Sequence, residues 1–135
     1  MSLENLIADF ELFDDWEDRY KYIIELGNAL DPLSVAEHSD DNKVPGCVSQ
    51  VWLVTEQEAD KLRFRGDSDA HIVRGLIAIL LDLYSNRAPG DILTIDAQAA
   101  FEKLGLGEHL TPQRSNGFYA MVQRIRNDAT ASLEV

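Results

Sequence analysis

The fold is decided by residues 50–85, QVWLVTEQEADKLRFRGDSDAHIVRGLIAILLDLYS. The first part, Gln50 to Glu56, is rich in β-branched and aromatic side chains and predicts a largely buried strand. Lys61 to Arg65 then alternates basic and apolar residues, which is typical of a half-buried antiparallel strand. Residues 57–60 supply a hairpin connection, and we expect Gly66 to close the second strand.

The second half of this stretch predicts a central buried helix. Ser68 or Asp69 can cap its start, and the helix is expected to run to about Ser85. Its apolar residues lie on nearly every side, as in a helix that other elements surround. A strand pair followed by such a helix indicates a sheet with helical cover.

Further helices are predicted on both sides of this stretch. Apolar spacing predicts one over 3–12 and another that starts at an Asp14 or Asp15 cap and ends at Asp31-Pro32. The polar residues 33–46 predict a loop. Later in the chain, Pro89-Gly90 should interrupt regular structure, and Asp96 should cap a helix over 97–104. Leu110-Thr111-Pro112 is expected to be a connector, and Ser115 should cap the last helix. The order indicates one α+β domain over 1–135, with helices packed on a small antiparallel sheet.

Composition argues against several classes of protein. The 135 residues carry a net charge of -12, whereas nucleic-acid and anionic-membrane binders need clustered Lys and Arg, so we expect neither partner. The longest apolar stretch, 72–84, falls short of the roughly 20 residues that span a bilayer. The first residues lack the basic region of a signal peptide, so the cytoplasm is the expected location.

Acidic side chains are concentrated in residues 1–45, which hold twelve acidic and three basic side chains. A solvated helix face and helix N-termini account for such a run, because the helix dipole favours negative charge there. A docking surface for a basic partner is the alternative.

Cys47 is the candidate for chemistry. It is the only cysteine, which excludes an intramolecular disulfide and suggests a reducing compartment. Pro45 fixes its own backbone and Gly46 permits a sharp or left-handed turn, so together they place the thiol near a loop end just before a strand. A small buried hydrophobe is the competing interpretation of a free cysteine.

Two other roles for Cys47 stay open from the residues alone. A cysteine-dependent hydrolase or transferase would need a histidine base, for which His38, His71 and His109 are available without a triad-like spacing. A zinc site made by Cys47 with His71, His109 or Asp69 has no supporting ligand spacing. The sequence has no Gly-rich phosphate loop and no dinucleotide fingerprint, so no cofactor is expected.

Four blocks of the sequence stand out: KVPGCVSQVW over 43–52, GDSDAHIVRGL over 66–76, HLTPQRSNG over 109–117 and WEDRYKYIIELG over 16–27. Together they resemble the SufE family of sulfur-acceptor proteins in iron–sulfur cluster assembly. The blocks occur in the family's order and cover nearly the whole chain, and the SufE and CsdE subtypes share them. Val48 stands where some relatives have a polar residue.

The resemblance implies a fold shared with IscU-type scaffolds and a SufS/CsdA-like cysteine desulfurase as partner. That partner uses its own pyridoxal phosphate to form a persulfide, and Cys47 attacks the outer sulfur and carries it to a cluster-assembly scaffold. No cofactor is then needed on this chain. A single cysteine suffices for the transfer and is too few for a cluster scaffold.

The same resemblance implies a set of partner-contacting residues, with residues 66–69 in a loop near the Cys47 loop: Gly46, Gln50, Asp67, Ser68, Asp69 and Arg114. A homodimer is compatible with the sequence. Besides the hydrolase or transferase, the alternative function is a non-covalent adaptor in which Cys47 is incidental.

Overall fold

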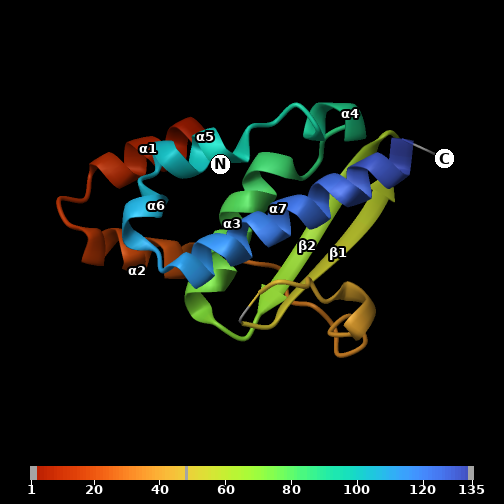
Figure 1. The fold of residues 1–135 in the computed structure, drawn as a ribbon, viewed down its shortest axis with the longest axis horizontal. Coiled ribbons are helices and arrows are strands. Elements are labelled where there is room, and N and C mark those ends of the chain that lie inside the picture. Colours follow the sequence, from red (N-terminus) through yellow and green to blue (C-terminus); the bar gives the residue numbers. More distant parts are fainter. Residues whose placement is uncertain (1–2, 48, 134–135) are drawn as a thin grey trace.

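The computed structural model describes residues 3–47 and 49–133. Along the chain, the hairpin of β1 (Val51–Glu58) and β2 (Lys61–Ser68) follows two helices, α1 (Leu3–Glu11) and α2 (Trp16–Asn28), and a short 3-10 turn, η1 (Asp40–Asn42). The helices after it are α3 (His71–Tyr84), α4 (Pro89–Ile92), α5 (Ala97–Lys103), α6 (Leu106–His109) and α7 (Pro112–Leu133). In Figure 1, α7 runs beside the hairpin, and α1, α2, α5 and α6 gather at the opposite end of the molecule. The α+β prediction is confirmed.

The hairpin is longer and tighter than predicted. The antiparallel pairing runs from Val51↔Ser68 to Glu58↔Lys61, so residues 57 and 58 belong to β1 and only Ala59 and Asp60 turn the chain. Our expectation that Gly66 ends β2 is wrong. Gly66 lies inside β2. A Cβ there would come within 2.8 Å of Ile77 Cγ2 and 2.9 Å of a Leu53 methyl, so the absence of a side chain lets α3 approach the sheet closely.

Helix α3 is the predicted central helix, but its start differs from the prediction. Its N-cap is Ala70, without a side-chain hydrogen bond, so Ser68 and Asp69 do not cap it. Helix α3 packs closely on α2, where Gly75 faces the backbone of Ile23: a Cβ on Gly75 would lie 2.1 Å from the Ile23 carbonyl oxygen. Two glycines, Gly27 and Gly75, therefore set the separation of these helices.

The other helix limits follow from local backbone chemistry. Asp15 and Asp96 cap α2 and α5 as predicted, each accepting from the backbone amide three residues later. Helix α2 ends at Asn28, ahead of the expected Asp31-Pro32 stop.

Prolines begin helices where we expected a break or a connector. Pro89 starts α4, and Pro112 starts α7, three residues ahead of the predicted Ser115 cap. Proline suits the first turn of a helix because the amide it lacks would have no partner inside the helix. The short helix α6 was not predicted.

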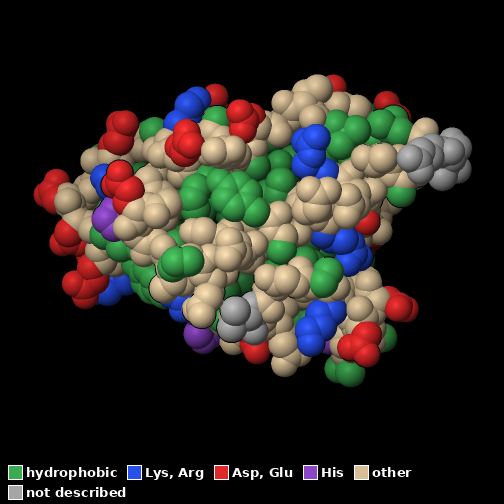
Figure 2. Space-filling model, in the orientation of Figure 1, with side chains coloured by type: hydrophobic (Ala, Val, Ile, Leu, Met, Phe, Trp, Pro, Cys, Tyr) green, Lys and Arg blue, Asp and Glu red, His purple; other side chains and the backbone are tan. Residues whose placement is uncertain are grey.

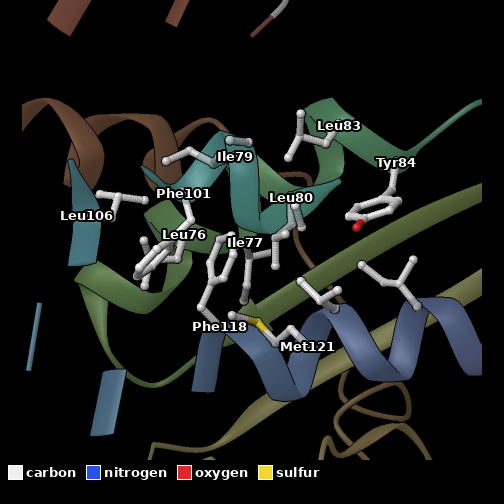
Figure 3. Packing of buried hydrophobic residues seen from close by; sticks show 14 of the residues in the cluster. Leu76, Ile77, Ile79, Leu80, Leu83, Tyr84, Phe101, Leu106, Phe118 and Met121 are labelled. Carbon is white, nitrogen blue, oxygen red and sulfur yellow. The ribbon is translucent and has the colours of Figure 1, made fainter. Parts of the chain in front are cut away.

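The core lies between the inner face of the hairpin and the helices. Leu76, Ile77 and Leu80 of α3 point toward Phe118 and Met121 of α7, as Figure 3 shows. Val51 and Leu53 of β1 belong to the same cluster. This packing fixes the first half of α7 against the sheet end from which the Cys47 loop emerges. None of the described helices is both long and apolar enough to cross a membrane.

Candidate functional site

The segment that carries Cys47 is a short loop closed at its base by the sheet. Lys43 forms an isolated bridge with Trp52, and the amide of Val44 donates to the carbonyl oxygen of Val51 at 2.8 Å. Val44 and Val51 are both buried, so the base is anchored in the core. Gly46 has a φ of 87°, a left-handed conformation that favours glycine. Val48 lies outside the described residues.

The Cys47 side chain forms part of the wall of a cavity of about 230 Å³ between the loop, α3 and α7. The thiol is partly buried and donates a weak hydrogen bond to the Gly117 carbonyl oxygen at 3.7 Å. The cavity is lined by both apolar and polar residues: Cys47, Ser49, Val51, Val73, Leu76, Thr111, Gln113, Arg114, Gly117, Phe118 and Met121.

Burial controls the reactivity of this thiol. Removal from water raises the pKa of Cys47 above its ordinary value, because the thiolate is the form that loses most solvation. The thiolate is the nucleophile in sulfur exchange, so the resting protein holds Cys47 in its less reactive form. Any change that exposes the loop to water would activate it.

Ser68 and Asp69 fasten the other end of the Cys47 loop. The Asp69 carboxylate accepts from the Gln50 amide at 3.0 Å, and the Asp69 amide donates to the Gln50 carbonyl oxygen at 3.3 Å. The Ser68 hydroxyl donates to the same carbonyl oxygen at 2.6 Å. The structure thus brings Gln50, Ser68 and Asp69 together beside Cys47, while their contact with a partner stays a prediction.

Asp67 accepts from the Ser68 amide at 2.8 Å, but residues 66–68 belong to β2 and do not form the loop that we predicted for 66–69. Asp67 lies in β2 with its side chain on the outer face of the hairpin, where it pairs with His38 Nε2 at 2.8 Å and Arg74 Nε at 3.1 Å. Both nitrogens of the His38 ring face oxygens, since Nδ1 lies 2.7 Å from the Ser34 carbonyl oxygen. The hydrogen bond to Asp67, with a smaller contribution from Ser34, raises the pKa of His38.

Arg114 lies in the first turn of α7 and lines the same cavity as Cys47. Its Nη1 donates to the Tyr20 hydroxyl at 3.0 Å, a contact between residues 94 positions apart. Among the described residues, the salt bridges do not include Arg114, so its charge is available to a ligand or partner. The sequence did not indicate Tyr20, Thr111, Gln113 or Gly117 as part of this site, because only the fold brings α2, α7 and the loop together.

The histidines do not form a catalytic pair with Cys47 in the described part of the chain. No histidine lines the Cys47 cavity there. His38 bonds to Asp67, and the ring of His109 stacks on Trp16 with centroids 4.1 Å apart. Within residues 3–47 and 49–133 no group of three or more His, Cys, Asp or Glu side chains could hold a metal ion. The geometry therefore favours a lone nucleophile over a triad.

The surface around the loop differs in charge from the rest of the molecule. Figure 2 shows acidic side chains gathered over the α1–α2 end, whereas the charged groups in view beside α7 are mainly Lys or Arg. Helix α7 exposes several uncharged polar residues, among them Gln113, Asn116, Gln123, Asn127 and Thr130, and its three arginines are partly buried. A partner that reaches Cys47 from this side would meet little of the negative charge.

Comparisons with known proteins agree with these features. A model of the SufE family, described as an Fe-S metabolism associated domain, matches residues 4–129. An uncharacterized SufE-like protein of Rhizobium etli is 53% identical over 132 residues, which cover 95% of this chain and 89% of that protein. Another from Rhizobium meliloti is 48% identical over 136 residues and covers 98% and 97% of the two chains.

A solved structure matches the fold over its whole length. The solution structure of a hypothetical protein from Thermus thermophilus aligns with a TM-score of 0.79 and covers 100% of both chains. Its sequence identity is 19%, so it shows the fold alone. The likeness to IscU-type scaffolds stays a prediction.

Proposed function

The chain belongs to the SufE family, which is associated with Fe–S metabolism, and from that premise we propose that it is a covalent sulfur carrier. Cys47 accepts the outer sulfur of a persulfide on a SufS/CsdA-like cysteine desulfurase, stimulates that enzyme and passes the sulfur to a cluster-assembly scaffold. The pyridoxal phosphate belongs to the desulfurase, and this chain acts as a carrier in the cytoplasm rather than as an enzyme with a free small substrate.

The observation that carries this proposal is a partly buried thiol at a cavity wall, on a loop fastened at both ends. In the transfer, the Cys47 thiolate attacks the outer sulfur of the donor persulfide, a new S–S bond forms, and the donor thiolate leaves. The cavity, which is partly open to solvent, then covers part of the added sulfur. Because the chain has one cysteine, no second thiol within it can displace the sulfur and close a disulfide.

Three groups support the transfer without reacting. Asp69 and Ser68 hold the loop in its resting position through Gln50, and Arg114 offers a planar cation beside the thiol. A docking partner that displaces Asp69 from Gln50 would release the loop and turn Cys47 outward. Gly46 and Asp67 lie on the exposed loop and the outer face of β2, where they would contact the partner rather than the sulfur.

Replacement of Cys47 tests the covalent mechanism. Cys47→Ser should abolish stimulation of a purified cysteine desulfurase, because a neutral hydroxyl is a poor nucleophile, while the free energy of unfolding changes by less than about 1 kcal/mol. Mass spectrometry of the wild-type protein after incubation with desulfurase and cysteine should show added sulfur on Cys47. Full stimulation by Cys47→Ser would instead favour a non-covalent adaptor.

A further inference from the structure

The Cys47 cavity is larger than one transferred sulfur requires. An added sulfur is about the size of a water molecule, which needs about 10–15 Å³ of cavity volume on the same measure. The cavity measures about 230 Å³, several times that volume. Gly117 leaves the space beside the thiol open, since a Cβ built there would already lie 3.7 Å from Cys47 Sγ, at contact distance.

The lining suits a chain of sulfur atoms. Sulfane sulfur carries no hydrogen-bond donor, so it can be buried against Val73 and Leu76 without leaving a polar group unsatisfied. Phe118 and Met121 supply a ring and a thioether, both favourable contacts for a polarizable sulfur. The lining also includes Arg114, whose guanidinium can bind the anionic end of such a chain.

Building on the proposed sulfur-carrier function, we propose that Cys47 stores more than one sulfur atom as a polysulfide within this cavity. After the first transfer, the terminal sulfur of Cys47–S–S⁻ attacks the outer sulfur of a second donor persulfide, Enz–S–SH. One S–S bond forms, the S–S bond of the donor breaks, and the products are Cys47–S–S–SH and the donor thiolate. Charge and atoms balance, and no external oxidant or reductant takes part.

The second transfer is chemically easier than the first. The same cavity surrounds the thiol and the perthiol, and a perthiol is intrinsically a stronger acid than a thiol, so at equal burial it is more fully ionised. Because Cys47 is the only cysteine, every sulfur after the first must extend the same chain. The number of sulfur atoms per molecule therefore measures the length of one polysulfide.

Mass spectrometry under non-reducing conditions tests this. The protein is incubated with excess purified cysteine desulfurase and cysteine, and the intact mass is compared with the cyanide-releasable sulfur. We expect additions of one, two and more sulfur atoms. Additions of a single sulfur only would overturn the storage proposal and leave the carrier function in place, and no addition would overturn both.

Variants that fill the cavity make the test specific. Gly117→Ala adds a methyl group at contact distance from the thiol, and Val73→Leu enlarges a lining side chain. In both variants, the ratio of longer adducts to the one-sulfur adduct should fall well below that of the wild type. Gly90→Ala is the matched control, because nothing lies within 4 Å of its added Cβ, and it should keep the wild-type distribution. Equal distributions in all four proteins would refute the role of the cavity.

Discussion

Removal of the Asp69 carboxylate should release the Cys47 loop. In the resting structure this carboxylate accepts from the Gln50 amide at 3.0 Å at an exposed position. Such a bond contributes about 1 kcal/mol, so Asp69→Ala should raise the population of the open loop about fivefold. Asp69→Asn keeps an acceptor oxygen at the same place and should stay close to the wild type.

The assay is the rate of iodoacetamide labelling of Cys47 in the free protein. If the loop opens and closes faster than it is labelled, the rate follows the open population, so Asp69→Ala should react about fivefold faster than wild type. Asp96→Ala is the matched control, since Asp96 accepts from the Ala99 amide at the same 3.0 Å at the start of α5. It should lower stability without changing the labelling rate.

The pH profile supplies an independent check on the same reasoning. Burial raises the pKa of Cys47, so half-maximal labelling of the folded protein should occur at a higher pH than in the urea-unfolded chain. In the unfolded chain a free cysteine has a pKa of about 8.5. In Asp69→Ala the profile should shift back toward the unfolded one. Equal labelling of wild type and Asp69→Ala, with the same pH profile, would refute the claim that Asp69 holds the thiol in the cavity.

Three further predictions concern docking, packing and pH. Arg114→Ala should raise the dissociation constant for the desulfurase mainly through faster release, by about 2 kcal/mol or more if a partner charge is left buried. Arg114→Lys should not restore the affinity, because lysine lacks the planar guanidinium. Unchanged release in surface plasmon resonance would exclude the docking role. Gly75→Ala should destabilise the protein by about 2–4 kcal/mol in urea unfolding despite its better helix propensity, because its Cβ would meet the Ile23 carbonyl, whereas Gly90→Ala should have little effect. The pKa of His38 is raised in the folded state, so its pairing with Asp67 stabilises the fold below the unfolded pKa of about 6.5, and this stabilisation is lost as pH rises through the folded pKa. From acidic to alkaline pH, the wild type should therefore lose up to about 1 kcal/mol of stability relative to His38→Gln. A stability difference that does not change with pH would contradict the pairing.

The sequence alone determined the elements that local chemistry specifies. Alternation over 61–65 and the apolar run over 72–84 identified the hairpin and the buried helix, and Asp15 and Asp96 identified two helix starts. The motif around Cys47 identified the candidate reactive residue and the family. These signals lie within a few residues of one another, so they can be recognised without knowing what packs where.

Only the tertiary structure decided how far the elements extend and which residues surround the thiol. Gly66 looked like the end of a strand, yet β2 continues through it, and its missing side chain makes room for Ile77 of α3, 11 residues later in the chain. Ser68 and Asp69 looked like helix caps, yet they bind Gln50, since the loop leaves two backbone groups there that need partners. Tyr20 reaches Arg114, and Gly117 reaches Cys47, only because α2 and α7 pack on the same core. A contact across 94 residues leaves no pattern in a single sequence.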